Sequence, residues 1–123
     1  MKLLVVDDNN VNRMVVLALL KRFNYDISIA INGKEALEKY KTRKFDCILM
    51  DIHMPQMDGI TSTKLIREYE KNNSLDETPI IALTVSHPEE DKSKCFSAGM
   101  NDFIRKPVTL NDLSLALSNI TTT

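Results

Sequence analysis

Five short, mainly apolar runs, the second of them interrupted by Ser28 but rich in β-branched residues, alternate along the 123-residue chain with segments whose apolar residues recur at helical spacing. A short continuous apolar run is typical of a strand that is buried on both faces of a sheet. Because such strands alternate with helices, the pattern favours an α/β fold in which helices cover both faces of a parallel sheet. The predicted strands are Leu3–Val6, Ile27–Ile31, Cys47–Met50, Ile80–Val85 and Phe103–Ile104.

The segments between these runs carry the start and stop signals of helices. The first follows Asn9 and Asn10, either of which can cap it. Pro88 with the acids after it begins another, and Gly99 ends it. Right-handed crossovers restrict five such units to a few doubly wound strand orders. The predicted helices follow Asn10, run from Gly33 to about Lys41 and from Gly59 to about Lys71, span Pro88 to Gly99, and span Leu110 to Ile120 with Thr109 or Asn111 near its cap.

Length and composition narrow the class of protein. The chain is 43% hydrophobic and 27% charged, as in an ordinary globular domain, and we expect one domain over residues 1–123. The net charge of −1 gives no reason to expect direct nucleic-acid binding or membrane binding. No apolar stretch approaches a membrane span and charges begin at Lys2, so we expect a cytoplasmic location. Cys47 and Cys95 are predicted to be reduced thiols, the first of them buried.

Polar side chains follow four of the predicted strands. In doubly wound sheets, ligands bind at the carboxyl ends of the strands. Asp7 and Asp8 follow the first run, Asp51 follows the third, Thr84 lies at the end of the fourth and Lys106 lies beyond the fifth. Three carboxylates at one edge repel one another by about 3 kcal/mol per pair at ~5 Å and an effective dielectric near 20. The set therefore predicts a site where a cation or a chemical reaction offsets this repulsion.

The residue types indicate phosphoryl chemistry. Asp7, Asp8 and Asp51 offer the hard oxygen ligands that suit Mg²⁺. Thr84 offers a donor to an oxyanion, and Lys106 offers a mobile positive charge. Neither glycine-rich nucleotide-binding motif occurs, so we do not expect the phosphate of a bound nucleotide. What remains is a phosphoryl group carried on a carboxylate, and Asp51 is the best candidate nucleophile because it stands alone at the centre of the array.

Four segments closely resemble a two-component receiver domain, and together they cover essentially the whole chain in the right order. This resemblance implies a flavodoxin-like fold with strand order 2-1-3-4-5. The stretch Asp7–Arg13 is most similar to receivers of hybrid histidine kinases and phosphorelays. The segments are VDDN (6–9), LMDIHMPQMDG (49–59), PIIALT (79–84) and AGMNDFIRKP (98–107).

The resemblance also implies a donor and a metal. Asp51 would accept a phosphoryl group from the phosphohistidine of a histidine kinase or a histidine phosphotransfer protein. Asp8 and Asp51 would ligate Mg²⁺ directly, Asp7 would act mainly through water, and the backbone carbonyl of His53 would complete the protein ligands. The chain would be a signalling module that promotes its own phosphorylation and dephosphorylation, with no external substrate to turn over.

The resemblance further implies a conformational switch. Thr84 and Lys106 would contact the phosphoryl oxygens, and Phe103 would be the rotating switch aromatic. The surface formed by the fourth helix, the fifth strand and the fifth helix would rearrange and bind a downstream partner. The residue before Pro107 is expected in a fixed turn that includes a cis peptide bond.

Some features leave alternatives open. Val85 stands where the family more often has a smaller residue, and His53 occupies a position where side chains tune dephosphorylation. A degenerate receiver that serves only as a docking scaffold would share the same fold. A haloacid-dehalogenase-like phosphatase also uses an aspartate nucleophile, but it needs a second acid where this chain has His53. A flavodoxin-like electron carrier would need a flavin-phosphate loop, and Asp7 and Asp8 would repel that phosphate.

Overall fold

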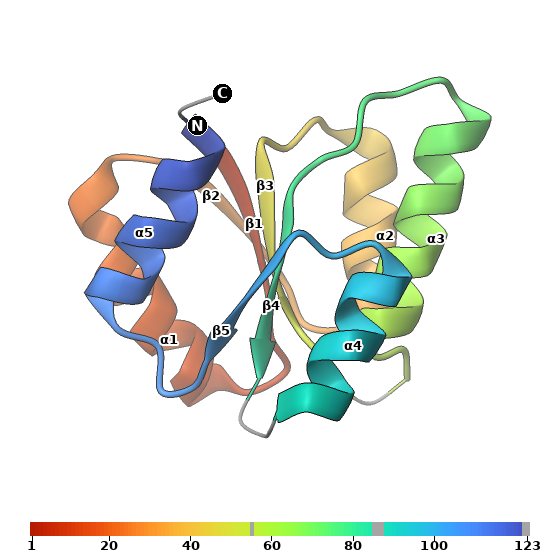
Figure 1. Ribbon diagram of the computed structural model, residues 1–123. Coiled ribbons are helices and arrows are strands. Elements are labelled where there is room, and N and C mark those ends of the chain that lie inside the picture. Colours follow the sequence, from red (N-terminus) through yellow and green to blue (C-terminus); the bar gives the residue numbers. More distant parts are fainter. Residues whose placement is uncertain (55, 85–87, 122–123) are drawn as a thin grey trace.

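The computed structural model describes residues 1–54, 56–84 and 88–121, with only the backbone described at 88–91 and 121. Five parallel strands form one sheet in the order β2-β1-β3-β4-β5 (Figure 1), which confirms the α/β doubly wound fold and the expected 2-1-3-4-5 order. The elements are β1 (Lys2–Val6), α1 (Asn10–Leu20), the 3-10 helix η1 (Lys21–Phe23), β2 (Asp26–Ala30), α2 (Gly33–Thr42), β3 (Cys47–Asp51), α3 (Gly59–Asn72), β4 (Ile80–Thr84), α4 (Pro88–Ala98), β5 (Asp102–Arg105) and α5 (Leu110–Thr121).

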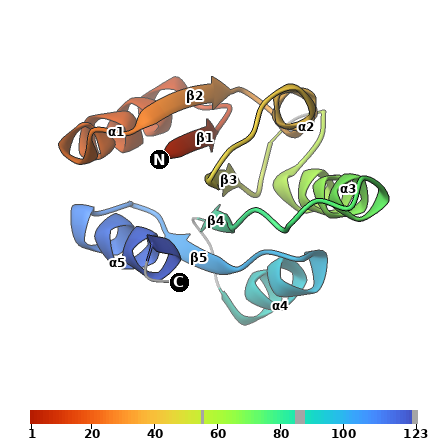
Figure 2. The same cartoon turned by 90° about the horizontal axis from the view of Figure 1, so that it is seen from above.

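The sheet lies between two helical layers. Figure 2 shows α1 and α5 on one side of it, and α2, α3 and α4 on the other. Successive residues of β1 point to opposite faces and enter two separate cores, both fully buried. Leu3 and Val5 pack with residues of α1 and α5, whereas Leu4 and Val6 pack with residues of α2 and α3. The continuous apolar run of β1 is thus explained by burial on both faces.

Described strand ends differ from the predicted ones by one residue, in most cases because a polar residue extends the strand. β3 continues through Asp51, which pairs with Leu83, and β5 includes Asp102 and Arg105. A backbone ladder does not depend on the side chain, so a polar residue can extend a strand beyond its apolar run. β2 ends at Ala30, and Ile31, which we expected inside it, is 48% exposed beyond its end.

Among the helix starts that the structure describes, four carry a side-chain cap. In each case the cap accepts a hydrogen bond from the backbone N–H three residues later, as such caps do. This resolves the two open predictions, in favour of Asn9 for α1 and Thr109 for α5, and the 3-10 helix η1 was not predicted. No helix among residues 1–54, 56–84 and 88–121 is long and apolar enough to cross a membrane. The capping residues are Asn9, Asn32, Asp58 and Thr109.

Candidate functional site

The sheet brings the three predicted acids together at its carboxyl edge. Asp7 follows β1 directly and Asp51 ends the neighbouring strand β3, while Asp8 is the next residue along the chain. One carboxylate oxygen from each lies within 4.8 Å of the other two. Asp7 is fully buried and Asp51 is 6% exposed, whereas Asp8 is exposed. The site is therefore an acidic pocket with two acids in its floor and one at its rim.

Lys106 reaches into this pocket from the far side. Its Nζ lies 3.2 Å from Asp7 Oδ2 and 3.4 Å from Asp51 Oδ1. Its backbone N–H donates to the Thr84 carbonyl at 2.6 Å, and its peptide bond to Pro107 is cis, as expected. One cation thus pairs with both buried acids at once, so the fold brings these three side chains together.

Asp7 is held by the start of α1. Its Oδ1 accepts a hydrogen bond from the Asn9 N–H at 2.9 Å, and its backbone carbonyl accepts one from Arg13 Nη1 at 2.8 Å. Arg13 also donates to the side chain of Asn10. The start of α1 therefore fixes one carboxylate oxygen and the backbone carbonyl of Asp7.

Burial is the main influence on Asp51. It raises the pKa of this carboxyl to about 6, because the charged form loses contact with water. Lys106 opposes the shift and Asp7 adds to it. Three carboxylates face one ammonium group, so the pocket lacks positive charge when all three are ionised. Hard oxygen donors at this spacing suit a divalent cation such as Mg²⁺.

The loop after β3 is packed tightly against the site. The N–H of Gly59 donates to the Ile52 carbonyl at 2.9 Å. A Cβ at position 59 would lie 2.1 Å from the Asp51 carbonyl oxygen and 2.9 Å from Met50 Cγ. Only glycine allows α3 to begin this close to the end of β3. His53 is exposed in the same loop, two residues beyond Asp51.

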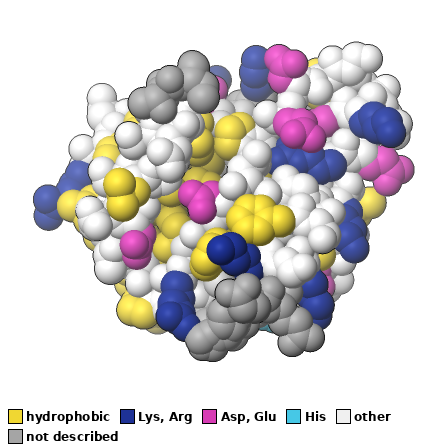
Figure 3. Space-filling view, viewed as in Figure 1, with side chains coloured by type: hydrophobic (Ala, Val, Ile, Leu, Met, Phe, Trp, Pro, Cys, Tyr) yellow, Lys and Arg dark blue, Asp and Glu magenta, His cyan; other side chains and the backbone are white. Residues whose placement is uncertain are grey.

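The remaining predicted residues lie along β4 and β5. Thr84 is the last residue of β4, is 5% exposed and pairs with Arg105. Phe103 pairs with Ala82 and is half-buried, and the Nζ of Lys92 lies 5.0 Å from its ring centroid. Hydrophobic side chains are visible on the surface along the β5 edge, between α4 and α5 (Figure 3). Val85 lies outside the described residues.

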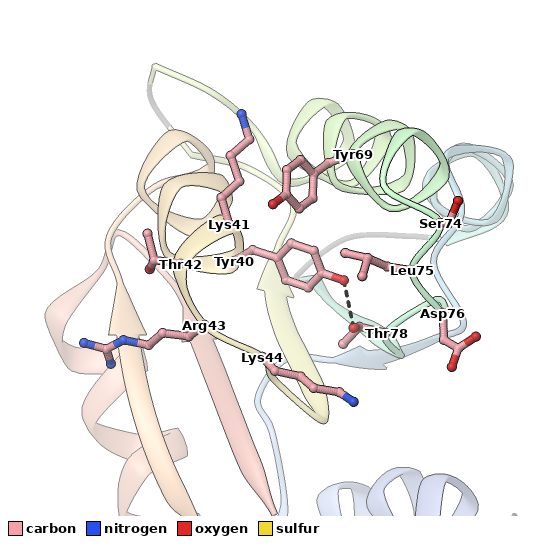
Figure 4. A pocket seen from close by; sticks show the side chains of 10 residues that line it. All are labelled: Tyr40, Lys41, Thr42, Arg43, Lys44, Tyr69, Ser74, Leu75, Asp76 and Thr78. Atoms are coloured by element: carbon pink, nitrogen blue, oxygen red, sulfur yellow. Dashed lines mark hydrogen bonds between the residues drawn. The ribbon is translucent and has the colours of Figure 1, made fainter.

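A second cavity, of about 420 Å³, opens at the opposite end of the sheet, near the last turns of α2 and α3 (Figure 4). Tyr40, Tyr69 and Thr78 line it. Glu70, which accepts hydrogen bonds from Tyr40 and Thr78, is 1% exposed and was not among the predicted site residues. The available signal was the spacing of Glu70, four residues after Ile66 on the core-facing stripe of α3.

This arrangement defines a class of protein. A flavodoxin-like sheet with an acidic pocket and an ion-paired lysine at its carboxyl edge, and without a nucleotide loop, is that of a phosphorelay receiver. The chain belongs to the response regulator receiver domain family, whose sequence profile it matches over residues 3–118. Receiver domains are signalling modules, so this chain is not an enzyme that acts on an external substrate.

Individual relatives agree with this assignment. The chain is 43% identical over 124 residues to hybrid signal transduction histidine kinase B of Dictyostelium discoideum, a match that covers 94% of the chain and 6% of the kinase. It spans between 3% and 15% of the length of the curated relatives considered. The expected likeness to receivers of hybrid histidine kinases is thus confirmed.

Two solved structures are also similar. The receiver domain of a Pseudomonas aeruginosa sensor histidine kinase, with a magnesium ion coordinated in its active-site cleft, is 34% identical with a TM-score of 0.88, over 99% of this chain and 98% of that one. The receiver domain of the Saccharomyces cerevisiae response regulator Ssk1, crystallised with the histidine phosphotransfer protein Ypd1, is 34% identical with a TM-score of 0.86. That match covers 93% of this chain and 83% of the other.

Proposed function

We propose that residues 1–123 form one receiver domain in which Asp51 accepts a phosphoryl group from a phosphohistidine, in a magnesium-dependent reaction. The donor is a histidine kinase or a histidine phosphotransfer protein. The observation that carries this proposal is the position of Asp51, which shares the cation of Lys106 with Asp7 and lies beside the exposed Asp8.

Asp51 is a better candidate phosphoacceptor than Asp7. Both oxygens of Asp7 are engaged, one by the Asn9 N–H and the other by Lys106. In the proposed reaction an Asp51 oxygen bonds to phosphorus while the phosphorus–nitrogen bond to the donor breaks, and its electron pair returns to the imidazole. Lys106 lies close enough to Asp51 to pair with a phosphoryl oxygen as charge moves onto the group.

The acids fit a magnesium site. Asp8 and Asp51 would hold Mg²⁺ directly, Asp7 would act through water and the His53 carbonyl would complete the protein ligands. When bound, the ion supplies positive charge to the transferring phosphoryl group. The similar Pseudomonas receiver, whose structure holds magnesium in the cleft, supports this choice of metal.

Thr84 and Phe103 are the proposed switch residues. Thr84 ends the strand beside β3, one residue beyond the partner of Asp51 in the ladder, and this position supports a role for its hydroxyl toward a phosphoryl group on Asp51. Phe103 lies on the neighbouring edge strand and is only half-buried, so it has room to change position. A downstream partner would read the resulting change on the surface formed by α4, β5 and α5.

The phosphodonor has an apolar surface to dock on. Val11 and Met14 are 69% and 68% exposed on α1, which begins directly after the acidic pocket. Val15 is 46% exposed and lines a small hollow of about 90 Å³ together with Lys106 and Pro107. An apolar helix face beside a reactive residue suits a helix of the donor protein. The yeast complex of a receiver with a phosphotransfer protein supports this kind of partner.

Phosphotransfer tests the proposal directly. A phosphorylated histidine phosphotransfer protein should lose its label to the wild-type chain when Mg²⁺ is present, and should keep it when EDTA is added. Asp51→Asn should receive no label, although its fold is unchanged by circular dichroism. If neither the wild type nor the variant is labelled by any donor, the chain is a docking scaffold instead.

A further inference from the structure

A group of hydrogen-bonded polar residues around the buried Glu70 ties α3 to the turn between α4 and β5, at the end of the sheet opposite Asp51. We name it the Arg67 clamp, and it consists of Arg67, Glu70, Gly99 and Asn101. Arg67 Nε and Nη2 donate to the Gly99 carbonyl at 3.0 and 2.8 Å, and Nη2 also donates to Asn101 Oδ1 at 2.9 Å. One planar guanidinium therefore holds both ends of the turn.

Asn101 connects the clamp to the sheet. Its Oδ1 accepts the Ile80 N–H at 2.9 Å, and its own backbone N–H donates to the Ile80 carbonyl at 2.8 Å. Ile80 is the first residue of β4, and β5 begins immediately after Asn101. The start of two strands and the end of α4 are thus fixed to one side chain of α3.

Glu70 holds Arg67 in place. Its Oε1 accepts from Arg67 Nη1 at 2.8 Å, and its Oε2 accepts from the Tyr40 hydroxyl at 2.5 Å and the Thr78 N–H at 2.7 Å. Figure 4 shows the further hydrogen bond, 2.9 Å long, between Tyr40 and Thr78. A buried ion pair contributes little net stability to a fold. We therefore attribute the Arg67–Glu70 pair, both members of which form further hydrogen bonds, to the position in which it holds the Arg67 guanidinium.

The turn is shaped to receive the guanidinium. Gly99 has φ +110°, which side-chain-bearing residues rarely adopt. A Cβ at this position would lie 2.8 Å from Arg67 Cγ and 3.1 Å from Arg67 Nε. Glycine is required here both for the backbone conformation and for the space that Arg67 fills.

The clamp lies beside the last turn of α4. Next to it, Cys95, Ala98 and Met100 are buried, so the end of the helix is anchored in the core. One turn before Cys95, Lys92 is exposed, and its ammonium lies over the ring of Phe103. The contact between α4 and the proposed switch residue therefore lies beyond the anchored end.

We propose that the Arg67 clamp is a fixed pivot that stays closed in both the resting and the phosphorylated state. The change that begins at Thr84 then turns α4 about its clamped end and moves Phe103, while the α4–β5 turn stays in place. Arg67 acts as a positioning residue, remote from the reacting atoms. This inference rests on the proposed phosphoacceptor function.

Nuclear magnetic resonance of the wild-type chain tests the pivot. Beryllofluoride with Mg²⁺, a phosphoryl analogue, should shift the amides of Ile52 and Thr84 at the site and those of Lys92 and Phe103 at the switch. The Arg67 Nε–H should remain protected from exchange with solvent, with its shift unchanged. Shifts at the site combined with exposure of this proton to exchange would overturn the pivot alone. Absence of shifts at the site would contradict the proposed function itself.

A pair of variants tests the positioning role. Arg67→Lys removes the paired bonds to the turn, and Tyr40→Phe removes a hydrogen bond to the buried Glu70 without touching the turn. The measured quantity is the chemical-shift change of the Phe103 amide divided by that of the Ile52 amide at saturating analogue. Arg67→Lys should reduce this ratio at least about twofold, whereas Tyr40→Phe should leave it unchanged. Equal ratios in both variants would show that the clamp only stabilises the fold. If Arg67→Lys does not fold, the exchange measurement on the wild type decides.

Discussion

Lys106 Nζ lies 3.4 Å from Asp51 Oδ1, so the side chain that follows β5 forms an ion pair with the last residue of β3. The same nitrogen lies 3.2 Å from Asp7, which makes it a shared counter-charge for both buried acids. A divalent cation would add positive charge to this site, whereas a phosphoryl group would add negative charge.

Removing the lysine should separate metal binding from phosphorylation. In Lys106→Met we expect phosphorylation by acetyl phosphate to slow by about 10²–10³, because a positioned charge on the transferring group is lost. The affinity for Mg²⁺ should rise, since a competing cation has left the pocket. Stopped-flow rates and magnesium titration would measure the two effects. Unchanged phosphorylation with Lys106→Met would contradict the role given to this residue.

The pH dependence of stability should report on Asp51. Its pKa is raised to about 6, so between about pH 4 and 6 the folded chain binds more protons than the unfolded chain. The contribution of this group to stability is therefore largest at low pH and is lost as the pH rises through 6. The shift of about two units sets a ceiling near 3 kcal/mol.

Asp51→Asn should accordingly be more stable than the wild type at pH 7.5 without metal, by about 1–2 kcal/mol. The advantage should shrink at pH 4 and also on addition of Mg²⁺, which favours the ionised wild-type carboxylate. Urea unfolding at both pH values, with and without the metal, measures this difference in the free energy of unfolding. A variant that is less stable at pH 7.5 without metal would show that burial does not dominate at this carboxyl.

Gly59→Ala should disturb the site through its backbone. The new methyl group would meet the Asp51 carbonyl, so we expect a loss of about 1–3 kcal/mol in the free energy of unfolding and weaker binding of Mg²⁺. Thr61→Ala, an exposed change in the same turn of α3, serves as the control. Thermal unfolding and magnesium titration are the measurements, and equal values for both variants would refute the packing argument.

Removal of the side-chain hydroxyl should have opposite effects on stability at two neighbouring residues of α3. Within the described part of the chain, Thr63 Oγ1 is buried without a hydrogen-bond partner, whereas Ser62 Oγ donates to the Gly33 carbonyl at 2.8 Å. Thr63→Val, which keeps the shape, should stabilise the chain by about 1 kcal/mol, and Ser62→Ala should destabilise it by a similar amount. Chemical denaturation of both variants checks this, and destabilisation by Thr63→Val would indicate an unseen partner for the hydroxyl.

Local sequence patterns predicted most of the fold. The apolar runs located β1, β3 and β4, because strands buried on both faces need no polar alternation, and β-branched residues located the edge strand β2. Asn9 and Thr109 were recognisable caps. The acidic pocket was also predictable, since strands of a parallel sheet bring their carboxyl ends to one edge. Strand ends were less so, because the ladder extends through polar residues such as Asp51.

The Arg67 clamp could not be predicted from local sequence patterns. Its members come from α3 and from the turn before β5, more than 30 residues apart in sequence, and Tyr40 adds a third element. Each residue has an ordinary local setting, and a charged residue near the end of a helix usually faces water. Only the tertiary fold, which buries Glu70, shows that these side chains act together.

Mass spectrometry of the chain after incubation with a phosphohistidine donor and Mg²⁺ tests the central claim most directly. The account predicts the mass gain of one phosphoryl group on the peptide that contains Asp51, labile to hydroxylamine as an acyl phosphate is, and no gain in Asp51→Asn. A stable phosphoryl group on any other residue, or an unmodified Asp51 with every donor, would contradict it.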